Sequence, residues 1–174
     1  MKHNPDVNPQ PAAPPPARMG GDDGDTVRRL VAERRHQPGA LLPILHAVQD
    51  ALGFVPDAAV PEIAEGLNLS RAEVHGVLTY YHHFRRQPAG RHVLQVCRAE
   101  SCQAMGSEAL WRHACHRLGL AEGGTSADGA VTLEPVYCLG LCASSPAVAL
   151  DERPRARMSA ARLDALIANA GASA

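Results

Sequence analysis

Four of the five cysteines in this chain form two close pairs. Cys97 and Cys102 have four residues between them, Cys138 and Cys142 have three, and 35 residues separate the pairs. Thiolates act as metal ligands or as nucleophiles in disulfide exchange. A redox-active dithiol normally has two intervening residues, and neither pair has that spacing. The spacing therefore favours metal binding over thiol–disulfide chemistry.

Two metal sites compete for these thiols. Structural zinc is usually held on tighter Cys-x-x-Cys knuckles. A cluster of two irons and two bridging sulfides occupies more room than one ion, and spacings of four and three suit it. We therefore expect a 2Fe-2S cluster on all four residues, with Cys97 and Cys102 on one iron and Cys138 and Cys142 on the other. A zinc-stabilised structural adaptor remains the alternative from another functional class.

The segments around the cysteines alternate between strand and helix patterns. Strands are predicted over 92–97, 130–138 and 146–150, and helices over 104–120 and 159–170. This order is that of a small thioredoxin-like layer structure. Each cysteine pair follows the end of a predicted strand, so both pairs should reach one edge of the sheet. Small flanking residues would let the backbone approach closely: Ala99, Ser101, Gly140, Ala143 and Ser144.

The first half of the chain has helical periodicity. Apolar residues recur at helical spacing from Thr26 to about residue 84, and Ser70 with Glu73 forms a capping box. The first 25 residues contain six prolines and few large apolar side chains. We predict an α+β chain in three parts: a disordered Pro-rich tail over 1–25, a helical bundle over 26–88 and a thioredoxin-like 2Fe-2S domain over 89–174.

Composition and missing motifs exclude several function classes. The net charge of -1 and the 3% aromatic content disfavour nucleic-acid binding. No apolar run approaches the roughly 20 residues of a membrane span, and the N-terminus lacks the apolar core of a secretory signal. We therefore expect a cytoplasmic protein. Neither common nucleotide-binding glycine motif is present, so NAD binding by this chain is not expected. The nine histidines suggest no second metal site, because neighbours such as His82 and His83 would point about 100° apart on a helix.

The complete cysteine pattern resembles that of the thioredoxin-like 2Fe-2S subunit of the NADH dehydrogenase module of respiratory complex I. The same family includes subunits of NAD-linked hydrogenases and the gamma subunit of NAD-dependent, molybdenum-containing formate dehydrogenases. The segments LNLSRAEVHGVLTYYHHFR, GRHVLQVCRAESCQ and VTLEPVYCLGLCASSPAV are most similar to the formate dehydrogenase gamma subunit. The resemblance covers about residues 28–166.

The resemblance implies an electron-transfer subunit with no formate or NAD active site of its own. Its one 2Fe-2S cluster, on Cys97, Cys102, Cys138 and Cys142, would exchange single electrons with an FMN- and NAD-binding partner subunit. A large molybdenum-containing formate dehydrogenase subunit would be the second partner. FMN, NAD, the molybdenum cofactor and further Fe-S clusters would lie on the partners. The alternatives are the equivalent subunit of complex I or of an NAD-linked hydrogenase. The resemblance also predicts a cis peptide bond before Pro146.

Overall fold

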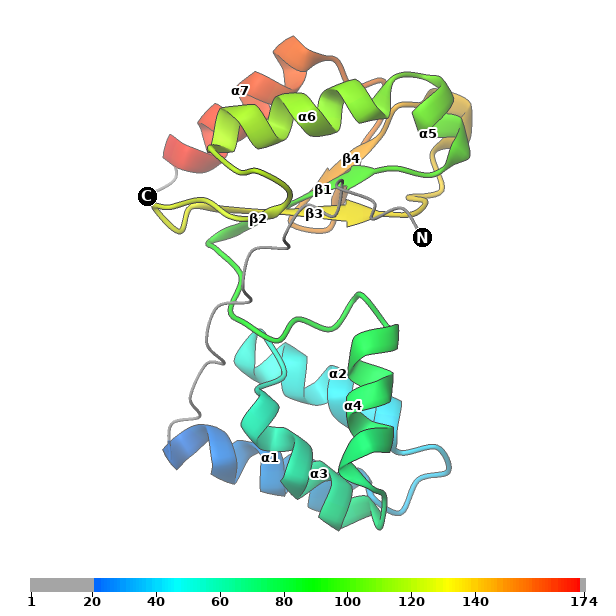
Figure 1. The fold of residues 1–174 in the computed structure, drawn as a ribbon, viewed down its shortest axis with the longest axis vertical. Helices are drawn as coiled ribbons and strands as arrows, with labels where there is room; N and C mark the ends of the chain where they lie inside the picture. The colour runs from blue at the N-terminus through cyan, green and yellow to red at the C-terminus, as the bar shows by residue number, and fades with distance from the viewer. Residues whose placement is uncertain (1–20, 173–174) are drawn as a thin grey trace, which may run out of the picture. The chain divides into compact units, whose positions relative to one another are not determined.

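The computed structural model describes residues 21–172, which form two compact units that divide between Pro88 and Ala89 (Figure 1). Helices and a five-stranded sheet together confirm the predicted α+β class. Across residues 21–172, none of the helices combines the length and apolar character that a bilayer span requires.

The first unit is helical. Its elements are α1 (Gly21–Arg34), α2 (Leu41–Leu52), a short 3-10 helix η1 (Asp57–Ala59), α3 (Val60–Leu67) and α4 (Arg71–Tyr80). Their apolar faces share one core, in which Val27, Ile44, Leu45, Val48, Ile63 and Val74 are fully buried. The predicted capping box is present, because the Ser70 side chain accepts the Glu73 N–H and the Glu73 carboxylate accepts the Ser70 N–H.

Two predicted boundaries in this unit are wrong. Helix α1 begins at Gly21, so residues 21–25 belong to the bundle and not to the tail. Acidic Asp22 and Asp23 lie in its first turn, where they interact favourably with the helix dipole. The rest of the predicted tail, residues 1–20, lies outside the described residues. The helix predicted to continue to residue 84 ends at Tyr80.

A buried glutamine holds the chain that follows α4. Gln49, which is 6% exposed, donates from Nε2 to the His83 carbonyl at 3.0 Å and accepts the Arg85 N–H at 2.7 Å. The YYHHF segment is therefore largely a turn fixed by α2. The His83 ring lies 5.5 Å from that of His46, measured between centroids.

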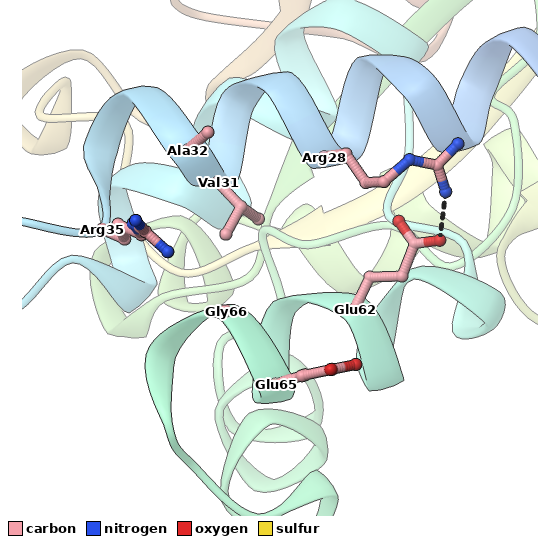
Figure 2. Close-up of a pocket in the computed structure, with 7 residues that line it drawn as sticks. All are labelled: Arg28, Val31, Ala32, Arg35, Glu62, Glu65 and Gly66. Carbon is pink, nitrogen blue, oxygen red and sulfur yellow. Dashed lines mark hydrogen bonds and ion pairs between the residues drawn. The ribbon is translucent and has the colours of Figure 1, made fainter.

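Helices α1 and α3 approach each other closely at Gly66. A Cβ atom on this residue would overlap with Cγ1 of Val31 on the facing helix. Beside this contact is a groove, shown in Figure 2, where Arg28 and Glu62 form an ion pair at 2.8 Å. Glycine at position 66 therefore sets the spacing of the two helices.

The second unit contains a five-stranded sheet in the order β2-β3-β1-β4-β5. The strands are β1 (His92–Cys97), β2 (Gly124–Thr125), β3 (Val131–Val136), β4 (Val148–Leu150) and β5 (Arg153–Arg155). β1 and β3 are parallel, with Cys97 opposite Val136, and the other pairings are antiparallel. β5, at one edge of the sheet, is exposed along its whole length.

Helices α6 (Ser107–Leu118) and α7 (Ala160–Ala172) pack along one face of this sheet (Figure 1). The short helix α5 (Glu100–Ala104) contacts α6, and a 3-10 turn η2 (Cys142–Ser144) begins at the last cysteine. The core between helices and sheet includes Leu94, Val96, Trp111, Leu133, Val148 and Leu163. The helix predicted over 104–120 begins only at Ser107, because Gly106 adopts a φ of +89° before α6, and the short helix α5 that precedes it was not predicted. The peptide bond before Pro146 is cis, as predicted.

Candidate metal centre

The four paired cysteines lie at or just beyond the ends of two neighbouring strands. Cys97 is the last residue of β1 and Cys102 lies in α5, whereas Cys138 follows β3 and Cys142 begins η2. Because β1 and β3 are parallel neighbours in register, their carboxyl ends meet at one edge of the sheet. All four side chains are free thiols. The topology thus delivers both pairs to the same edge.

One pair is buried and the other is exposed. Cys97 and Cys102 are each 2% exposed and pack against Ala147. Cys138 and Cys142 are exposed, with their sulfur atoms 3.8 Å apart. A cofactor bound between the pairs would have a protected inner side and an accessible outer side.

Backbone amides favour the ionised form of Cys97. Burial alone would raise the pKa of this thiol. It is outweighed by hydrogen bonds from the Ala99 N–H and the Cys102 thiol, and from the N–H groups of Cys138 and Leu139, which together lower the pKa of Cys97 below its ordinary value. Since the thiolate is the metal-binding form, this environment suits a ligand.

The neighbouring sulfur of Cys138 acts on Cys142. The pKa of the Cys142 thiol is raised, first by its hydrogen bond to Cys138 and the negative charge there, then by burial, and least by charge on Cys102 and Cys97. The Gly140 N–H donates to the Cys138 sulfur at 3.4 Å and offsets part of that charge. The exposed pair therefore has its two sulfurs in contact and a backbone amide directed at one of them, which suits thiolate ligands of an iron–sulfur cofactor.

In the described part of the chain, no three histidine, cysteine or acidic side chains could together hold a single metal ion. What the structure offers to a cofactor is two cysteine pairs at one sheet edge. The fifth cysteine, Cys115, lies in the core of the second unit and is 7% exposed.

Two serine hydroxyls join the cysteine loops. Ser101 Oγ donates to the Cys142 carbonyl at 3.0 Å and lies 2.9 Å from Ser145 Oγ. Ser145 Oγ is also 2.9 Å from the Cys142 carbonyl and 3.5 Å from the Cys102 sulfur. Sequence reasoning noted Ser101 and Ser144 as small flanking residues and missed Ser145.

Arg98 fastens the first cysteine loop to α6. Its guanidinium makes two hydrogen bonds to the Glu108 carboxylate, at 2.8 and 3.0 Å, and lies 5.0 Å from the ring centroid of Trp111. The Gln103 side chain donates to the Arg98 carbonyl at 2.9 Å. Arg98 is thus committed to Glu108 and Trp111, so its role here is structural.

Comparison with known proteins identifies sequence relatives that are subunits of NADH-quinone oxidoreductases. The chain is 42% identical over 113 residues to such a subunit from Pseudomonas aeruginosa, and the alignment covers 65% of this chain and 68% of the relative. It is 38% identical over 143 residues to a subunit of the NADH-quinone oxidoreductase of Rhizobium meliloti, covering 82% of this chain and 85% of the relative.

Solved structures give a similar result. The chain matches an NAD+-reducing [NiFe]-hydrogenase in the air-oxidized state with a TM-score of 0.64 and 29% identity, over 80% of this chain. It spans about a quarter of that hydrogenase chain, 24% of its length.

These relatives help to choose among the three kinds of complex considered from the sequence. NADH-quinone oxidoreductases and an NAD+-reducing hydrogenase support the alternatives to the formate dehydrogenase interpretation, and the complex I alternative fits better. The family described as Thioredoxin-like [2Fe-2S] ferredoxin matches residues 27–171. Because that match includes both cysteine pairs, the chain belongs to the thioredoxin-like 2Fe-2S ferredoxin family and is an oxidoreductase electron-transfer subunit with a 2Fe-2S cluster.

Proposed function

We propose that this chain is the 2Fe-2S electron-transfer subunit of a complex I type NADH dehydrogenase module, with Cys97, Cys102, Cys138 and Cys142 as the cluster ligands. The observation that carries the proposal is the convergence of both pairs at one sheet edge, where amides lower the pKa of Cys97. The names of the sequence relatives support the choice of complex.

The bound cluster would accept and release single electrons. The chain's own part is to hold it and to control its access to water. Cys97 and Cys102 provide a buried inner wall, and the outer pair stays accessible. Tyr137, next to Cys138, is 63% exposed, and Met105 in the turn after α5 is 60% exposed. We assign this surface to contact with a flavin- and NAD-binding partner, since exposed aromatic and methionine side chains are enriched at interfaces.

A formate dehydrogenase complex is the second candidate, favoured by the resemblance of segments 67–85 and 90–103 to its gamma subunit. In that case a large molybdenum-containing subunit would be a further partner. A cytoplasmic location is part of the same proposal, because a reducing compartment keeps five free cysteines unpaired.

Gentle purification of the tagged chain from its native cells tests the choice of complex. Co-purification of a flavin-containing, NAD-oxidising or NAD-reducing partner without molybdenum supports the complex I proposal. Stoichiometric molybdenum and formate-dependent NAD reduction would select the formate dehydrogenase. Hydrogen-dependent NAD reduction would select the hydrogenase.

Single Cys→Ser substitutions test the ligand set. Each change at Cys97, Cys102, Cys138 or Cys142 should abolish or strongly alter the iron content and the EPR spectrum. Cys115→Ser is the matched control and should retain both, because this residue lies in the core away from the loops. Wild-type iron content and spectra in the variants of either pair would contradict the assignment.

A further inference from the structure

The hydroxyls of Ser101 and Ser145 share one acceptor, the Cys142 carbonyl. Both oxygens lie within 3.0 Å of the Cys142 carbonyl oxygen, and they lie 2.9 Å from each other. Ser145 Oγ has a further neighbour, the Cys102 sulfur, at 3.5 Å. Each hydroxyl carries one proton. The two serines thus have two protons to share between the carbonyl, the sulfur and one another.

The Ser145 proton has two acceptors within reach, the Cys142 carbonyl at 2.9 Å and the Cys102 sulfur at 3.5 Å. As a thiolate, the form that binds iron, Cys102 can only accept. Ser101 alone can then satisfy the Cys142 carbonyl, at 3.0 Å, and the Ser145 proton is free to turn to sulfur.

We propose that Ser145 donates an O–H···S hydrogen bond to the Cys102 thiolate and thereby raises the reduction potential of the cluster. Ser101 is the positioning residue, because its hydroxyl also donates to the Cys142 carbonyl and so weakens that oxygen as an acceptor of the Ser145 proton. The inference rests on the proposed role of Cys102 as a ligand.

A simple charge argument predicts that this hydrogen bond raises the reduction potential. Reduction adds one electron, and no protein bond is formed or broken. A hydrogen bond to a ligand sulfur offsets negative charge, so it stabilises the reduced state more than the oxidised state. Cys102 is 2% exposed, so water cannot readily replace the lost donor.

Four variants separate this role from a merely structural one. Ser145→Ala should lower the ratio of reduced to oxidised protein at a fixed potential by about threefold to tenfold, where tenfold corresponds to about 59 mV for one electron. Ser101→Ala should also lower this ratio, but by a smaller factor than Ser145→Ala. The double variant should shift no further than Ser145→Ala alone, since Ser101 acts through Ser145. Ser145→Thr keeps a hydroxyl and should restore the wild-type value.

Ser144→Ala is the matched control. This residue lies next to Ser145 on the same loop, and its hydroxyl takes no part in the hydrogen bonds that join Ser101, Ser145 and the Cys142 carbonyl. It should leave the potential unchanged.

The experiment is an EPR-monitored redox titration of the full chain, purified without air, with iron and sulfide measured on each sample. A lower midpoint potential in Ser145→Ala at wild-type iron and sulfide content supports the proposal. An unchanged midpoint with an intact cluster overturns it. If Ser145→Ala does not retain the cluster, Ser101→Ala decides in the same way, since a lowered midpoint supports the proposal and an unchanged one overturns it. A wild-type chain without iron and sulfide would overturn the proposed function itself, and the analysis of metal content tells these failures apart.

Discussion

Replacing Gly66 with alanine should force helices α1 and α3 apart. The new Cβ would overlap with Cγ1 of Val31, which is 6% exposed and packed in the core of the helical unit. A valine in a helix has one strongly preferred rotamer and cannot turn away cheaply. Figure 2 shows Val31 and Gly66 on the facing sides of the two helices, so we expect the contact to be relieved by moving α1 and α3 apart.

Two opposing contributions determine how far Gly66→Ala changes the free energy of unfolding. Overpacking a well-packed core costs about 1–3 kcal/mol. Alanine in place of glycine inside a helix stabilises the folded state by about 0.5–1 kcal/mol. We expect Gly66→Ala to lower the free energy of unfolding by up to about 2.5 kcal/mol. Gly76→Ala in α4 is the control, because a Cβ there meets nothing within 4 Å and should raise stability by about 0.5–1 kcal/mol.

Chemical denaturation followed by far-UV ellipticity measures both changes. Trp111, the single tryptophan, lies in the other unit, and its emission shows whether that unit unfolds in the same transition. Gly66→Ala should unfold at lower denaturant concentration than the wild type, and Gly76→Ala at higher. A Gly66→Ala protein as stable as Gly76→Ala would refute the close packing of α1 and α3.

Three further predictions concern polar contacts. Arg98→Ala removes both hydrogen bonds to Glu108 and the contact with the Trp111 ring, so it should destabilise the second unit by about 1–2 kcal/mol. Tryptophan emission should then show unfolding at a lower denaturant concentration. An unchanged transition would show that Arg98 and Glu108 do not pair in solution. Asp151→Asn weakens contacts to the His92 ring at 2.7 Å and should lower the thermal midpoint, whereas an unchanged midpoint would argue against this contact. Hydrogen bonds from the Ser70 N–H and hydroxyl lower the pKa of Glu73. The contribution of Glu73 to the stability of the fold is therefore fully present above its ordinary pKa of 4.5 and is lost as the pH falls through the lower pKa of the folded state. The stability difference between wild type and Glu73→Gln should therefore shrink from about pH 7 to about pH 3 in parallel melts, and a constant difference would contradict the capping contact.

Local patterns were enough to predict the family and the candidate ligands. The gaps between Cys97, Cys102, Cys138 and Cys142 are a property of the sequence itself, and the strand order places both pairs at one edge without knowledge of side-chain positions. The capping box at Ser70 was likewise readable, because both partners lie within four residues of each other.

Features that depend on long-range contacts could not be read in this way. Ser145 meets Ser101 across 44 positions, and Gly66 meets Val31 on another helix. Gly106 looks like an ordinary helix residue until its positive φ divides α5 from α6. The acidic and glycine-rich start of α1 resembles a tail in composition, although its aspartates suit a helix N-terminus. Likeness of short segments also favoured formate dehydrogenase, whereas longer alignments favour complex I.

The most direct test of the central claim is metal and sulfide analysis of the chain purified without air, combined with low-temperature EPR before and after dithionite. The 2Fe-2S assignment predicts two irons and two acid-labile sulfides per chain, with a one-electron signal that appears on reduction. Stoichiometric zinc, no labile sulfide and no signal would contradict it, and would mean that the four cysteines hold a structural ion instead of an electron carrier.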